Sequence, residues 1–101
     1  MIDEIVCFKL VSGEEVIAKV IRANQDELTL QDARVIGLMQ NARGEIEIQF
    51  APMLFSGNAK DTLQLNRKSV TAYQTPVNDN YLTPYIEVTT GITLPKKLLV
   101  E

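Results

Sequence analysis

The clearest structural signal in this chain is residues 5–21, which read IVCFKLVSGEEVIAKVI. Apolar side chains recur at every second position over 6–10, the period that places them on one face of a β-strand. Ser12-Gly13 then supplies turn residues, and the alternation resumes over 16–21. This pattern predicts an antiparallel hairpin at the beginning of the chain.

A third and longer strand is predicted over 28–38, after a polar turn at 24–27. Apolar residues continue through most of this segment, which favours a strand with a buried face. The polar pair Gln31-Asp32 interrupts them, so we expect the strand to bend there.

Residues 45–50 show the strictest alternation in the sequence and read EIEIQF. A strand here would turn its acidic side to water and place Ile46, Ile48 and Phe50 on the core side. Pro52 cannot donate a backbone hydrogen bond, so it marks a sheet edge or a bulge.

Two more short strands are predicted over 63–65 and 70–75, on either side of the polar segment 66–69. Short strands joined by tight turns favour a mainly β fold. Because a flat sheet of this size would expose its apolar face, we expect the strands to form a small, strongly bent five-stranded barrel over about 4–76.

A helix is predicted after the barrel, in the C-terminal segment of helix and tail at about 78–101. Asn78 or Asp79 can cap its start, and Gly91 stands where a glycine commonly ends a helix. Pro84 and the β-branched residues 88–90 oppose this helix, since proline is expected only in a first turn. Apolar and aromatic residues nevertheless recur at helical spacing, at Leu82, Tyr85, Ile86 and Thr89.

The composition limits what the protein can do. The 101 residues include 10 Lys and Arg, 13 Asp and Glu and no His, for a net charge of −3. This length suits a single domain, 1–101. Without His, the usual nucleophile systems, His-ligated zinc sites and the neutral-pH proton shuttle cannot form. We therefore expect no enzyme, with no catalytic residues, no cofactor and no metal site.

The same composition indicates a compartment. Cys7 is the single cysteine, so an intrachain disulfide cannot form and a reducing environment suits the chain. The first four residues are acidic where a signal peptide would be basic, and no apolar run approaches the roughly 18 residues of a membrane span. We expect a cytoplasmic protein that does not enter a membrane.

Residues 11–21 and 28–33, VSGEEVIAKVI and LTLQDA, are similar to the first motif of Sm and Sm-like proteins. In that motif a turn glycine precedes a bent strand and then a strand of the type L-x-L-x-[DN]. Residues 65–70, LNRKSV, stand where the family's second motif falls. Over nearly its whole length the chain resembles small Sm-like proteins of marine cyanophages, through its V-x-G-E-E-V-I opening, Asn80-Tyr81 and the tail residues 91–95, GITLP.

This resemblance implies an Sm-like (SH3-like) barrel that forms a homo-oligomeric ring and binds RNA or single-stranded DNA, with a role in nucleic-acid processing. A phage-encoded chain would act in the host cell cytoplasm. Edge strands of neighbouring subunits would pair, and the segments 46–50 and 70–75 would offer such edges. The family's base-holding positions carry Ala23, Glu27 and Asn66 in this chain, and each substitution removes an expected contact.

The remaining candidates for nucleic-acid contact lie in two polar segments. Arg67 and Lys68 are adjacent cations that every subunit of a ring would repeat along a phosphate backbone. Asn66 precedes them, and Asn24 and Gln25 carry amides that can bond base edges. Ordinary solvated turns explain the same residues.

The three tyrosines, Tyr73, Tyr81 and Tyr85, offer either stacking surfaces for bases or packing surfaces for the fold. An alternative function also stays open, a structural or protein-interaction ring that does not bind nucleic acid. The net negative charge and the three substituted positions are consistent with it.

Overall fold

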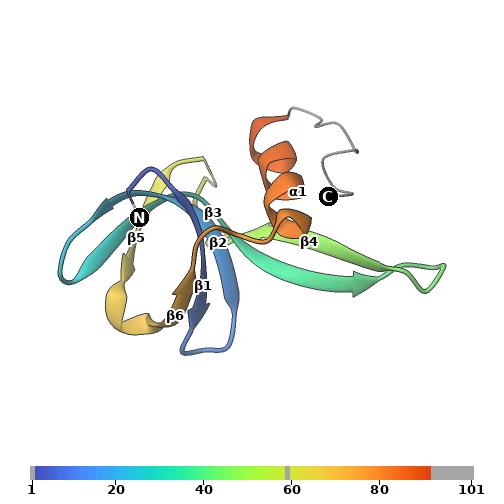
Figure 1. The fold of residues 1–101 in the computed structure, drawn as a ribbon, viewed down its shortest axis with the longest axis horizontal. Helices are drawn as coiled ribbons and strands as arrows, with labels where there is room; N and C mark the ends of the chain where they lie inside the picture. Colours follow the sequence, from blue (N-terminus) through green and yellow to red (C-terminus); the bar gives the residue numbers. More distant parts are fainter. Residues whose placement is uncertain (1, 59, 92–101) are drawn as a thin grey trace.

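The computed structural model describes residues 2–58 and 60–91 and is mainly β (Figure 1). Its C-terminal helix is α1 (Asp79–Thr90), and a short 3-10 helix, η1 (Arg67–Ser69), lies between the last two strands. The strands are β1 (Ile5–Leu10), β2 (Glu15–Ala23), β3 (Glu27–Gln40), β4 (Ile46–Pro52), β5 (Thr62–Asn66) and β6 (Val70–Gln74).

The six strands form one open antiparallel sheet in the order β4-β3-β2-β1-β6, with β5 paired to β3. The mainly β fold with a C-terminal helix is confirmed. All six strands match predicted segments, so the expected count of five was too low by one. β3 pairs with β2 along one edge and with two strands, β5 and β4, along the other. Its residues 27–31 pair with β5, whereas its residues 34–40 pair with β4. Asp32 lies between the two segments with a left-handed φ of 53°, which confirms the predicted bend.

The predicted hairpin of β1 and β2 is also confirmed, with Phe8 opposite Val16. Gly13 has a φ of 96° in the connecting turn, a conformation that favours glycine. Leu10 N donates to Glu14 O at 2.9 Å and closes this turn.

Each face of the sheet buries its own apolar cluster. On one face the cluster is built by alternate residues of the strands. Its buried members are Val6, Phe8, Leu10, Val16, Ala18, Val20, Leu28, Leu30, Ala33 and Leu65. On the other face α1 packs through Tyr85 against Ile17, with Val77 beside them. The sheet therefore has a core on both sides, and α1 covers only part of its second face (Figure 1).

The ribbon formed by β3 and β4 projects beyond the rest of the sheet (Figure 1). At its base the rings of Phe50 and Tyr85 meet in a T-shaped contact, with their centroids 5.9 Å apart. Further out Ile46 is 64% exposed, so the prediction that it lies on the core side is wrong. Ile46 shares a face with Phe50, but the neighbouring strand β2 ends its pairing with β3 near the base of the ribbon.

The helix follows the sequence prediction at both ends. Asn78 Oδ1 accepts a hydrogen bond from Asn80 N at 2.9 Å, and Gly91 ends the helix with a φ of 75°. Pro84 lies beyond the first turn, so the expectation that restricted it to that turn is wrong. Pro84 has no backbone N–H, so the helix loses one hydrogen bond there. Packing of Tyr85 against the sheet stabilises the helix in spite of this loss. The predicted tail at 92–101 lies outside the described residues.

Candidate nucleic-acid interface

The turn between β2 and β3 holds the first two candidate residues. Asn24 Oδ1 accepts hydrogen bonds from Asp26 N and Glu27 N, each at 2.8 Å. Its side chain therefore replaces backbone groups in closing the turn, as asparagine commonly does. Gln25 is exposed at the tip of the turn, and its amide makes no hydrogen bond within the described residues.

The other three are Asn66, at the end of β5, and Arg67 and Lys68 in the short helix η1 that follows it. Asn66 Oδ1 caps η1 by accepting from Lys68 N at 2.9 Å, and Ser69 Oγ donates to Asn66 O at 2.6 Å. Arg67 and Lys68 are both exposed. The local sequence therefore folds into a capped turn that presents two cations to solvent.

The two turns meet through Arg67. Its backbone N–H donates to Asp26 O at 2.9 Å, and its guanidinium Nη1 donates to Asn24 O at 2.8 Å. The pairing of β3 with β5 sets Glu27 opposite Asn66 at the base of both turns. All five predicted residues thus lie on one continuous surface, which we call the two-turn surface, defined by residues 24–27 and 66–69.

The formal charges of the two-turn surface sum to zero. Arg67 and Lys68 carry two positive charges, and the exposed carboxylates of Asp26 and Glu27 carry two negative ones. Arg67 is partly committed to Asn24, whereas the Lys68 amine makes no contact with a polar group of the described residues. Lys68 is therefore the cation of this surface that is best placed to meet a phosphate.

The three tyrosines have different environments. Tyr85 is 2% exposed, and its hydroxyl donates to Asp32 O at 2.8 Å, so its ring belongs to the core. Burial raises the pKa of this hydroxyl above its usual range, and the nearby Asp32 carboxylate adds to the rise. Tyr73 is 59% exposed on β6, and Tyr81 on α1 is half-buried.

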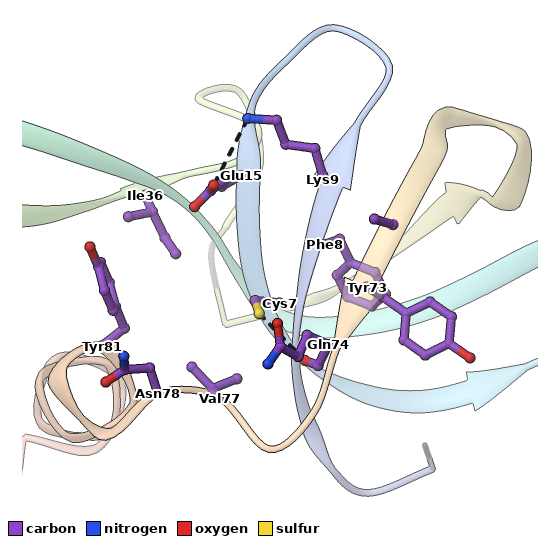
Figure 2. A pocket seen from close by; sticks show the side chains of 11 residues that line it. Cys7, Phe8, Lys9, Glu15, Ile36, Tyr73, Gln74, Val77, Asn78 and Tyr81 are labelled. Carbon is purple, nitrogen blue, oxygen red and sulfur yellow. Dashed lines mark hydrogen bonds and ion pairs between the residues drawn. The ribbon is translucent and has the colours of Figure 1, made fainter.

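Tyr81 lines a cavity that the sequence did not predict (Figure 2). This cavity, of about 360 Å³, lies between α1 and the strands β1 and β6. Its walls come from segments far apart in the chain, among them Cys7, Gln74 and Tyr81. No local motif joins these residues, so only the folded chain reveals the cavity.

Neither a scan against protein-family models nor a search of curated proteins finds a match to this chain. Within residues 2–58 and 60–91, no group of three or more acidic, Cys or His side chains is arranged to hold a metal ion. No helix in that part of the chain has the length and apolar character of a membrane span. Function is therefore inferred from the geometry of the described residues.

Proposed function

We propose that this chain is a non-catalytic, Sm-like protein that forms a homo-oligomeric ring and binds RNA or single-stranded DNA on the two-turn surface. The observation that carries the proposal is the bridge from Arg67 to Asn24 at 2.8 Å. It joins two turns that are distant in the sequence into one surface, on which Lys68 and Gln25 are exposed. A cation and a free amide on one surface suit contact with a phosphate and with a base edge.

The ring half of the proposal is supported by the ends of the sheet. β4 and β6 end the path of paired strands, so each has an outer edge without a partner among the described residues. Unpaired strand edges readily take up another strand, and copies of the same chain can provide it. The segments 46–50 and 70–75 were predicted to be edges, and β4 (46–52) and β6 (70–74) overlap them.

Oligomerisation also matters for affinity. The two-turn surface of one monomer offers only Arg67 and Lys68 as cations, and Asp26 and Glu27 oppose them. A ring repeats Lys68 once in every subunit, and several weak contacts along one strand combine into a much stronger one. We therefore expect measurable binding by the assembled protein and a steep loss of binding as salt rises.

A second function, a structural or protein-interaction ring without nucleic-acid binding, is favoured by the acidic half of the same surface. The carboxylates of Asp26 and Glu27 repel phosphate, and the whole chain has a net charge of −3. In that function the bridge from Arg67 to Asn24 serves only to hold the turns together.

Fluorescence anisotropy with labelled single-stranded RNA and DNA, across a salt series, tests the proposal. We expect Lys68→Ala to weaken binding about threefold to tenfold and to lower the salt slope by about one. Asp26→Asn should strengthen binding, because it removes a repelling charge. Arg43→Ala is the matched control, since Arg43 is an exposed cation at the distant tip of the ribbon.

The oligomeric state is measured on the same samples by light scattering behind size exclusion. If the protein forms a ring but does not bind the oligonucleotides at low salt, the second function replaces the proposed one. A monomer at working concentration would contradict both.

A further inference from the structure

The ribbon of β3 and β4 carries an apolar stripe on one face. Cross-strand neighbours of an antiparallel pair lie on the same face of a sheet, and so do residues two apart in one strand. Leu38 pairs with Ile48, and Ile46 lies two residues before Ile48, so the three side chains share a face. Leu38 is 60% exposed, Ile46 is 64% exposed and Ile48 is half-buried. We call Leu38, Ile46 and Ile48 the ribbon stripe.

The ribbon stripe continues an apolar track that begins near the end of α1. Val88 is 51% exposed and lies three residues after Tyr85, one turn further along the helix. Tyr85 contacts Phe50 at the base of the ribbon, where Figure 1 shows α1 beside the strands. Phe50 lies two residues after Ile48 and shares its face. The track therefore has two exposed ends, Val88 and the ribbon stripe, and a covered middle where Tyr85 meets Phe50.

We propose that residues 92–101 of this chain, which lie outside the described residues, pack in extended form along this track on their own ribbon. The segment reads ITLPKKLLVE and holds two apolar groups, at 92–94 and 98–100, with the polar part Pro95-Lys96-Lys97 between them. The first group lies beside Val88, and the second lies on the ribbon stripe. The polar part passes the covered middle of the track, where no exposed apolar surface needs a partner.

The length of the segment fits the track. The helix rises about 9 Å over the six residues from Tyr85 to Gly91, and β4 advances about 14 Å over the four residues from Ile46 to Phe50. With 5.9 Å between the ring centroids of Tyr85 and Phe50, the track measures about 29 Å. Ten extended residues span at most about 33–36 Å. The segment therefore reaches the outer end of the ribbon, with residue 98 near Ile48 and residue 100 near Ile46.

The end of α1 directs the chain toward the track. Gly91 has a left-handed φ of 75°, and its N–H donates to Glu87 O at 2.8 Å. A left-handed residue at this position closes the helix and turns the chain back along it. The segment after Gly91 thus starts in the direction of Val88 and the ribbon.

A second copy of the chain suits the ribbon stripe less well than the chain's own segment. A stable interface between two proteins covers about 800 Å² on each partner. The ribbon face over 46–50 and its partners on β3 is about 17 Å long and about 10 Å wide, which is several times less. A segment joined directly to α1 does not need such an area, because the covalent connection raises its effective concentration to about the millimolar range.

Disulfide trapping in the full chain tests the proposal. In a Cys7→Ser background, which removes the native thiol, Ile48→Cys is combined with Leu98→Cys and the protein is oxidised mildly. We expect a disulfide within one chain, because packing brings the two Cβ atoms to about 4 Å. Mass spectrometry and a non-reducing gel detect it. The matched control combines Leu98→Cys with Gln49→Cys, since Gln49 is exposed on the opposite face of the ribbon, and should react at least about tenfold more slowly.

Each of three other outcomes overturns the proposal. Disulfides formed mainly between chains would show that the stripe binds the segment of a second copy. Equal rates for Ile48→Cys and Gln49→Cys would show that the segment does not select the apolar face. No disulfide with either variant would leave the stripe to a different partner.

Methyl NMR gives a second readout that needs no cysteine. Leu98→Asp places a charge against the ribbon stripe, so the methyl resonances of Ile46 and Ile48 should move relative to those of the wild type. Thr93→Asp adds the same charge between the two residues that face α1, and it should leave these resonances in place. Unchanged resonances in Leu98→Asp would also overturn the proposal.

This inference is independent of the proposed function. The segment covers a face of the ribbon, whereas assembly into a ring would use the outer edge of β4. Neither measurement uses nucleic acid, so a failure of oligonucleotide binding does not affect the result of either one.

Discussion

Removing one oxygen atom, in Tyr85→Phe, tests how α1 is fixed to the bend of β3. Tyr85 is 2% exposed, and its hydroxyl donates to Asp32 O at 2.8 Å. A neutral hydrogen bond contributes about 1 kcal/mol, and the variant also leaves the Asp32 carbonyl with one partner fewer. We expect the free energy of unfolding at pH 7 to fall by about 1–2 kcal/mol.

The difference in stability between the wild type and Tyr85→Phe should also depend on pH. Burial raises the pKa of the Tyr85 hydroxyl above its ordinary value of 10.0, so folding favours the neutral phenol. This stabilisation is complete below pH 10 and is lost as the pH rises from the unfolded-state pKa through the folded-state pKa. The loss amounts to about 1.4 kcal/mol per pH unit, and Phe cannot show it. The stability difference between wild type and variant should therefore shrink by about 1.4 kcal/mol between pH 9 and pH 11.

Urea unfolding followed by circular dichroism at pH 7, 9 and 11 measures both effects at one fixed protein concentration. Tyr73→Phe is the matched control, because Tyr73 is 59% exposed and should tolerate the change at every pH. The reasoning is refuted if Tyr85→Phe is as stable as the wild type at pH 7. It is equally refuted if the stability difference stays constant between pH 9 and pH 11.

Two further predictions concern stability and are checked by the same unfolding measurement at pH 7. Asn24→Ala should lower the free energy of unfolding by about 1 kcal/mol, because two backbone N–H groups lose their acceptor, whereas Gln25→Ala should change it by less than about 0.5 kcal/mol. Phe50→Ala should cost about 2–3 kcal/mol through the lost contact with Tyr85, and Ile46→Ala, on the same face but 64% exposed, should cost less than about 0.5 kcal/mol. Equal losses for Phe50→Ala and Ile46→Ala would contradict the arrangement of the ribbon.

The fold was predictable where local patterns determine it. Alternation over 5–21 is sufficient for the first hairpin, since a period of two and a turn glycine fit no other structure well. The caps at Asn78 and Gly91 similarly determine the ends of α1. Alternation specifies which residues share a face, but it does not specify what covers that face. Ile46 was therefore assigned to the core although nothing among the described residues buries it.

The candidate site was predictable only in part, for a related reason. Asn24 and Asn66 are turn residues by their chemistry, and each turn could be located from the sequence. Their meeting depends on the pairing of β3 with β5, a long-range contact that no local pattern encodes. The cavity was not predictable from the sequence, because Cys7, Gln74 and Tyr81 come together from two strands and a helix.

The structural role of Arg67 links assembly to binding in the proposed function. Because Arg67 donates both its backbone N–H and its guanidinium to the turn at 24–27, its charge is held in place and is partly offset by Asp26 and Glu27. Lys68 is then the main available cation of the two-turn surface, and a single exposed lysine binds nucleic acid too weakly to matter at physiological salt. Affinity must come from several copies acting on one strand, so the outer edges of β4 and β6 are as necessary to binding as the two-turn surface itself. A change that prevents edge pairing should therefore abolish oligonucleotide binding while leaving the fold of each chain intact.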